Sequence, residues 1–158
     1  MKSNIRKAAP SAVSAASMLL GLASMVMAAS GRFELAAWFI IYCTFLDKAD
    51  GSLARALNAS SRFGVEMDSY SDFTAFGLAP AALTWFSLGG DPPATTLWVA
   101  FGSLTWVLMT AIRLARFNLE SGGESEDFEG VPTTLAAGVF ASLFLTLDHQ
   151  GLLDQWGP

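Results

Sequence analysis

The chain has 158 residues, of which 53% are hydrophobic and only 15% charged, with a mean hydropathy of +0.44 and a net charge of −5. This length suits one domain, and the composition excludes an ordinary soluble one. No basic patch interleaved with aromatic residues occurs in the sequence, so nucleic acid is not an expected partner.

Uncharged runs predict the helical elements in chain order. A helix needs ~20 residues to cross a hydrocarbon core of ~30 Å, and four runs approach that length. They are residues 11–31, 73–90, 92–112 and 130–147. A fifth run, residues 35–46, is too short alone and spans only if its helix continues into DKADGSLARAL. We expect an all-α integral membrane protein, a polytopic transmembrane helix bundle of about five spans forming one domain over residues 1–158.

Turn and helix-breaking residues separate these runs. Residues 30–31 predict a short turn, and residues 58–61 predict a break after the second helix. Residues 119–131 form the longest polar connection. Pro80 lies inside the third span, where a missing N–H is expected to kink the helix.

Basic residues predict the orientation of the bundle. Of the 9 lysine and arginine residues, all but Arg32 lie before the first span, between the second and third, or after the fourth. This bias predicts a cytoplasmic N-terminus and places residues 47–72 at the cytoplasmic surface.

The second predicted helix carries two carboxylates on one face. At about 100° per residue, Asp50 lies about 60° around the helix from Asp47, and Gly51 about 40°. Ala54 lies about 20° from Asp47, and Arg55 is at the edge of the same face. The small residues leave room for a flat or phosphorylated ligand, whose charge the guanidinium can neutralise.

The third predicted helix carries two more carboxylates. Gly64, Asp68 and Asp72 step by four and therefore fall on one stripe. Asp47 and Asp50 end the apolar part of one span, whereas the other two aspartates begin the next. Antiparallel packing of the two helices therefore predicts all four carboxylates at one depth, just inside the cytoplasmic surface.

Four crowded carboxylates repel one another and resist removal from water. Bound divalent cations neutralise this repulsion, and a site whose ligands are all oxygen atoms favours Mg²⁺, Mn²⁺ or Ca²⁺. Two metal ions about 3.5–4 Å apart are the usual clamp for displacement at phosphorus. The residues by themselves therefore predict a phosphotransfer site at a membrane surface.

Two other interpretations compete with this one. Interfacial acids in ordinary salt bridges would explain one aspartate at a helix end better than four on facing stripes. A divalent-cation transporter also uses intramembrane carboxylates, but a transport path needs them spread across the bilayer depth. Here all four lie at one side, which favours the phosphotransfer site over the transporter.

The complete pattern resembles the signature of a known family. It reads Asp47-x2-Asp50-Gly51-x2-Ala54-Arg55-x8-Gly64-x3-Asp68-x3-Asp72. All of its fixed positions match the CDP-alcohol phosphotransferases, also called CDP-alcohol phosphatidyltransferases. The resemblance implies a helical membrane enzyme that uses a CDP-linked lipid and two divalent metal ions, Mg²⁺ or Mn²⁺. It implies Asp72 as the catalytic general base. The implied metal ligands are Asp47, Asp50, Asp68 and Asp72, and the implied nucleotide-binding residues are Gly51, Ala54, Arg55 and Gly64.

Flanking segments narrow the resemblance. FGVEMDSYSDFTAFGLAPA at 63–81, RLARFN at 113–118 and FEGVPTTLAAG at 128–138 are similar to the bacterial-type phosphatidylserine synthases of that family. This similarity implies transfer of a phosphatidyl group from CDP-diacylglycerol to L-serine at a bacterial inner membrane, giving phosphatidylserine and CMP. Inositol phosphate, glycerol phosphate and choline remain the alternative acceptors.

The acceptor residues are expected at the same cytoplasmic side. Arg113 and Arg116 lie three apart on one helix face, where they can bind the serine carboxylate or the lipid phosphate. Glu66 can meet the serine ammonium, and Asn118 is a further substrate-binding candidate.

The chain departs from the family in two places. Its start, APSAVSAAS, resembles the family's Pro-Asn start only loosely, with Ser11 where Asn is common. The family core also has one more span than the runs predict here. We expect either that C-terminal helices are lacking or that a homodimer completes the wall with a neighbouring subunit.

Overall fold

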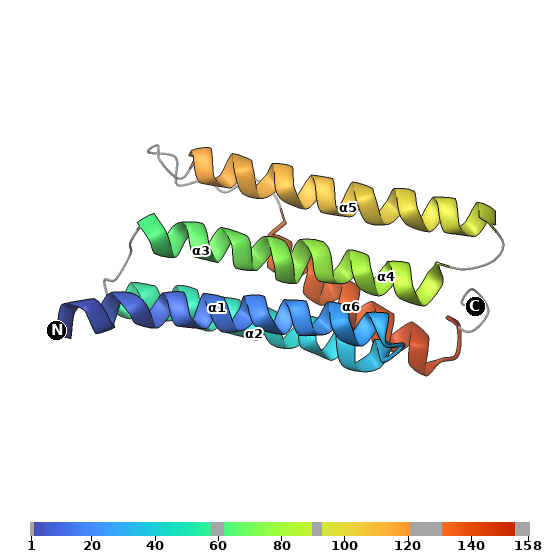
Figure 1. Ribbon diagram of the computed structural model, residues 1–158, viewed down its shortest axis with the longest axis horizontal. Helices are drawn as coiled ribbons and strands as arrows, with labels where there is room; N and C mark the ends of the chain where they lie inside the picture. Colours follow the sequence, from blue (N-terminus) through green and yellow to red (C-terminus); the bar gives the residue numbers. More distant parts are fainter. Residues whose placement is uncertain (1, 58–61, 90–92, 121–130, 154–158) are drawn as a thin grey trace.

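The computed structural model describes residues 2–57, 62–89, 93–120 and 131–153 (Figure 1). All of the regular secondary structure in these ranges is helical, which confirms the predicted fold class. The elements are α1 (Lys2–Ala29), α2 (Phe33–Leu57), α3 (Arg62–Asp72), η1 (Phe73–Leu78), α4 (Ala79–Leu88), α5 (Pro93–Glu120) and α6 (Thr133–His149). Within the helices, the side chains outside the described part are those of residues 2–10, 50–51, 53–57, 62, 93–94 and 120.

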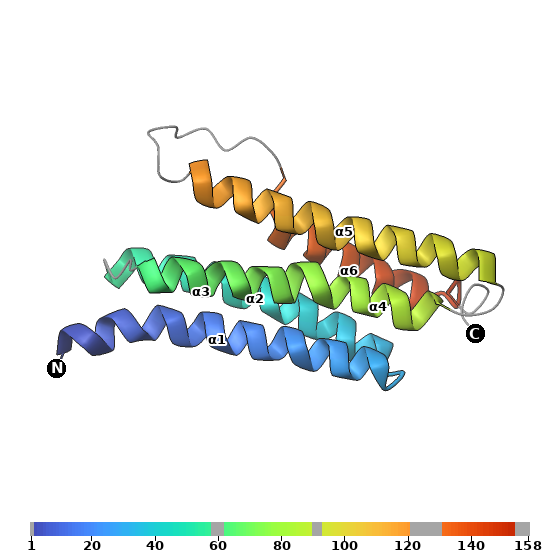
Figure 2. The same ribbon diagram turned by 45° about the horizontal axis from the view of Figure 1, so that its top comes forward.

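The helices run lengthwise beside one another (Figures 1 and 2). α3, η1 and α4 follow each other without a break and form one long rod. α1 packs against α2 and this rod, α5 packs against η1 and α4, and α6 packs mainly against α2. α1 and α5 contain segments long and apolar enough to cross a membrane, and α6 is a shorter apolar helix. The count of about five spans remains a prediction.

Small polar residues join α1 to α2. The turn between these helices has Gly31 at φ 74°, a conformation that glycine adopts at little cost, as residues 30–31 predicted. The buried Ser24 hydroxyl donates to the Ala36 carbonyl oxygen at 2.8 Å. The Cys43 thiol donates to the Ser17 carbonyl oxygen at 3.4 Å and is buried, as its place in an apolar run predicted. Short side chains with local hydrogen bonds let two apolar helices approach closely.

Gly21 brings α1 closest to the central rod. A Cβ atom placed on Gly21 would lie 2.9 Å from the Ala75 Cα atom of η1. That distance is shorter than real Cβ contacts, so the contact requires glycine. The largest fully buried side chains among the described residues are Phe76, Ile40 and Leu83.

The rod departs from α-helical geometry just before Pro80. Because Pro80 lacks an N–H, the Phe76 carbonyl four residues earlier has no α-helical partner. The Trp106 indole of α5 donates to this carbonyl at 2.9 Å. The backbone widens to a π-helix over Phe73–Leu78, where the Ala79 N–H bonds to the Thr74 carbonyl. The disturbance predicted from Pro80 therefore takes the form of a π segment that starts directly after Asp72.

Candidate metal centre

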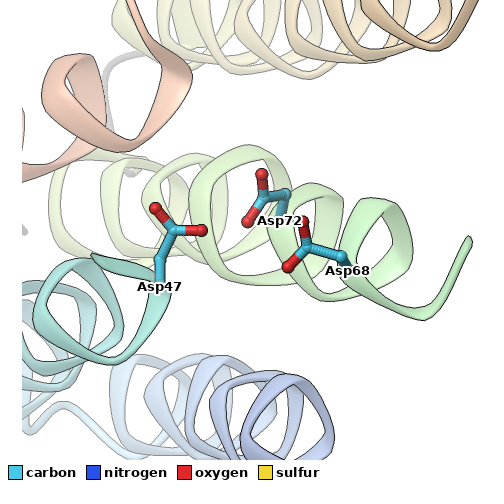
Figure 3. A group of neighbouring side chains, drawn as sticks. All are labelled: Asp47, Asp68 and Asp72. Atoms are coloured by element: carbon cyan, nitrogen blue, oxygen red, sulfur yellow. The ribbon is translucent and has the colours of Figure 1, made fainter. Parts of the chain in front are cut away.

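Three predicted metal ligands meet where α2 faces α3 (Figure 3). Asp47 projects from α2 toward Asp72 of α3, and Asp68 lies beside Asp72 on the same helix. One carboxylate oxygen from each residue lies within 4.8 Å of the others. Asp47 and Asp72 are half-buried, whereas Asp68 is exposed. Three carboxylates this close repel one another unless a proton or a cation intervenes.

The chain geometry explains why these aspartates meet. Asp47 lies ten residues before Leu57 at the end of α2, and Asp72 lies ten residues after Arg62 at the start of α3. At 1.5 Å per residue, both are about 15 Å from the connection between the two helices. The antiparallel pair therefore brings them to the same level, and the step of four adds Asp68 on the same stripe.

The remaining signature residues are placed less completely. Asp50, Gly51, Ala54 and Arg55 belong to α2, but their side chains lie outside the described part of the chain. Gly64 lies one turn before Asp68 on α3 and is half-buried. The structure thus brings together three of the four predicted aspartates and leaves the position of the Asp50 carboxylate undescribed.

A hydroxyl from α6 also reaches the cluster. Thr134 Oγ1 donates to Asp47 Oδ2 at 3.0 Å, and the carboxyl groups of Asp47 and Asp72 lie within hydrogen-bond reach of each other. Sequence reasoning did not select Thr134. The only signal was its place in the segment FEGVPTTLAAG, since no helical periodicity links residues this far apart.

Arg113 approaches the cluster from α5. Its guanidinium is close enough to Asp72 for their charges to interact. Arg113 also lines a mostly apolar cavity of about 420 Å³ between α5 and α6. Thr105, Thr110 and Thr133 line the same cavity, so a charged group and three hydroxyl-bearing residues adjoin a mostly apolar space.

The other predicted acceptor residues lie on α3 and near the end of α5. Glu66 is exposed and, two residues before Asp68, lies about 200° around α3 from it. Arg116 is exposed near the end of α5. Asn118 Nδ2 donates to Ser69 Oγ at 3.0 Å, which joins the end of α5 to α3. Arg113 is the acceptor candidate whose charge acts on Asp72.

The fold and the site together define the class of protein. It is a helical membrane protein with a candidate metal centre, formed by carboxylates that adjacent helices bring to one level. The sequence profile of the CDP-alcohol phosphatidyltransferase family matches residues 7–157. The chain belongs to this family, whose fold is an all-α membrane bundle and whose members are generally metal-dependent.

Individual relatives show which members of the family the chain resembles. A CDP-diacylglycerol–serine O-phosphatidyltransferase of Helicobacter pylori (strain J99) is 37% identical over 142 residues, which cover 89% of this chain and 58% of that protein. The Saccharomyces cerevisiae protein of the same name is 40% identical over 113 residues, covering 65% of this chain and 39% of the yeast protein. Mouse Transmembrane protein 269 is 33% identical over 134 residues, covering 85% and 49%. No solved structure matches the chain. The chain therefore spans 58% or less of each of these relatives.

Proposed function

We propose that this chain transfers a phosphatidyl group from CDP-diacylglycerol to the hydroxyl of L-serine, giving phosphatidylserine and CMP. The observation that carries the proposal is the meeting of Asp47, Asp68 and Asp72 at one level of the bundle. The printed names of the Helicobacter and yeast relatives support serine as the acceptor.

The donor set fits divalent metal ions. All of the described ligand atoms are carboxylate oxygens, which hard cations such as Mg²⁺ and Mn²⁺ prefer. We propose that Asp47, Asp68 and Asp72, together with Asp50, hold two such ions. Bound there, the ions would supply positive charge to the phosphoryl oxygens and neutralise the crowded carboxylates.

Asp72 is the proposed general base. The serine hydroxyl oxygen forms a bond to the β-phosphorus, its proton passes to an Asp72 carboxylate oxygen, and the bond to the departing CMP oxygen breaks. Asp72 is half-buried between Asp47 and Asp68, so water has limited access to the carboxylate that takes the proton.

Arg113 is the proposed anion-binding residue. Its guanidinium lies near Asp72 and borders the apolar cavity between α5 and α6. From that place it can bind the serine carboxylate or a lipid phosphate by charge-assisted hydrogen bonds. We propose that Arg55, Gly51, Ala54 and Gly64 line the nucleotide site, as the family signature implies.

The proposed location is a bacterial inner membrane with the N-terminus and the active site in the cytoplasm. The distribution of lysine and arginine supports this orientation, because all of them but Arg32 belong to segments on the side of the aspartates.

The first experiment measures CMP release from CDP-diacylglycerol by purified, detergent-solubilised protein with Mg²⁺ or Mn²⁺. L-serine, inositol phosphate, glycerol phosphate and choline are supplied separately. We expect release with serine only, and a loss of about 10²–10⁴-fold in Asp72→Asn because the general base is removed. Asp148→Asn, a half-buried aspartate near the other end of α6, is the matched control and should keep full activity. Release with another acceptor would overturn serine, and no release with any acceptor would contradict the enzyme proposal for this chain.

A further inference from the structure

Thr134 contacts the aspartate cluster from outside the family signature. It is the second residue of α6, is half-buried, and donates its hydroxyl proton to Asp47 Oδ2 at 3.0 Å. This side-chain hydrogen bond joins α6 directly to one of the proposed metal ligands. Such a bond restricts rotation of the carboxylate about its Cβ–Cγ axis, which otherwise costs entropy when a ligand binds.

The packing of α6 on α2 holds the two residues at this distance. Gly138 lies one turn after Thr134, and Thr44 lies just under one turn before Asp47. A Cβ atom on Gly138 would lie 3.3 Å from Thr44 Oγ1, so the helix backbones are close at this level. A larger residue at position 138 would crowd the Thr44 side chain and disturb the contact of α6 with α2.

The first turn of α6 is also fixed. Pro132 precedes the helix with φ −55° and ψ 138°, and the Ala136 N–H bonds to the Pro132 carbonyl oxygen at 3.0 Å. Proline restricts the backbone at the helix start, so Thr134 enters the site from a preorganised turn. The first turn of α6, whose N–H groups carry partial positive charge, lies beside the Asp47 carboxylate.

We propose that Thr134 is a positioning residue, whose hydroxyl orients the Asp47 carboxylate for binding a divalent cation. This inference rests on the proposed metal centre and deepens it. Some groups hydrogen-bond to a metal ligand without contacting the metal itself. Their removal typically lowers metal affinity by about 10–100-fold. Thr134 acts through Asp47 and needs no contact with substrate.

The test is Mn²⁺ binding, measured by calorimetry or by the electron paramagnetic resonance signal of free Mn²⁺, on purified protein without substrate. Thr134→Val removes the hydroxyl at nearly constant shape, and we expect Mn²⁺ affinity to fall by about 10–100-fold. Thr134→Ser keeps the hydroxyl and should retain most of the affinity. Thr146→Val is the matched control, because the Thr146 hydroxyl bonds only to the Ser142 carbonyl of its own helix in the recorded contacts.

The outcomes separate this inference from the proposed function. Equal Mn²⁺ affinity in Thr134→Val and the wild type, with affinity lost in Asp47→Asn, would overturn the role of Thr134 and leave the metal centre standing. No Mn²⁺ binding by the wild type would overturn both. If Thr134→Val and Thr134→Ser weakened binding equally, the hydroxyl would not be the cause and the inference would be wrong. A raised KM for serine at unchanged Mn²⁺ affinity would also overturn it, because Thr134 would then contact the substrate.

Discussion

The two sides of the central rod are built differently. Toward α1 and α2, Gly21 brings the backbone of α1 against Ala75, and Ser24 and Cys43 bond to carbonyl oxygens across the α1–α2 contact. Toward α5 and α6, the helices leave a cavity of about 420 Å³ with Arg113 at its wall. At Gly21 the backbones of α1 and η1 lie too close to admit a ligand between them, whereas the α5–α6 side offers apolar space next to a charged group. We infer that the contacts of α1 chiefly serve stability, whereas the space between α5 and α6 takes part in substrate binding next to the aspartates of α2 and α3.

Replacing Arg113 tests the α5–α6 side of the rod. Of the variants that compare the two sides, it should have the largest effect on activity. Arg113→Gln keeps a polar side chain but removes the charge that faces Asp72 and the cavity. Loss of a hydrogen bond to a charged group costs about 1.5–3 kcal/mol, so kcat/KM for CMP release should fall about 10–100-fold. The thermal unfolding midpoint should change little, because the side chain is only partly buried.

Arg32→Gln is the matched control for Arg113. Arg32 is exposed in the turn between α1 and α2, far along the bundle from the aspartates. Its replacement should leave kcat/KM unchanged. Equal activity of Arg113→Gln and the wild type would remove Arg113 from the proposed site and weaken the assignment of binding to the α5–α6 side.

Two glycine substitutions compare the packing of the two sides directly. Gly21→Ala places a methyl group 2.9 Å from the Ala75 Cα atom, and backbone atoms cannot move aside cheaply. We expect the free energy of unfolding to fall by about 1–3 kcal/mol. Gly102→Ala on α5 meets no atom within 4 Å and should be neutral or slightly stabilising, because alanine favours helix.

Thermal unfolding in detergent, followed by far-ultraviolet circular dichroism, measures both glycine variants. The predicted ranking places Gly21→Ala well below the wild type and Gly102→Ala at or above it. Equal destabilisation by the two substitutions would contradict the difference in packing on which the comparison depends.

Local helix geometry was the part of the fold that could be predicted from sequence. The step of four that aligns Gly64, Asp68 and Asp72 and the turn at Gly31 both follow from backbone rules over a few residues. The meeting of Asp47 with α3 followed from two antiparallel helices joined by a short connection. Each of these inferences needed only residues close together along the chain.

Contacts between distant helices could not be predicted in the same way. Thr134 is 87 residues from Asp47 along the chain, and which face of α6 meets α2 depends on packing at Gly138 and Thr44. Pro80 indicated a disturbed helix, but the π form also depends on Trp106 of α5, which bonds to the Phe76 carbonyl that Pro80 leaves without an α-helical partner. Helical periodicity identifies the faces of a helix but does not identify its neighbours.

Asn118 gives the smallest expected effect and decides whether a predicted substrate-binding residue is instead structural. Its amide donates to Ser69 Oγ at 3.0 Å at an exposed site, so the bond should contribute about 0.5–1.5 kcal/mol to stability. If Asn118 only joins α5 to α3, Asn118→Ala and Ser69→Ala should lower the unfolding midpoint equally, and the double variant no further. All three would then keep the wild-type KM for serine. A raised KM in Asn118→Ala but not in Ser69→Ala would instead place the Asn118 amide against the substrate and extend the binding side from Arg113 toward the end of α5.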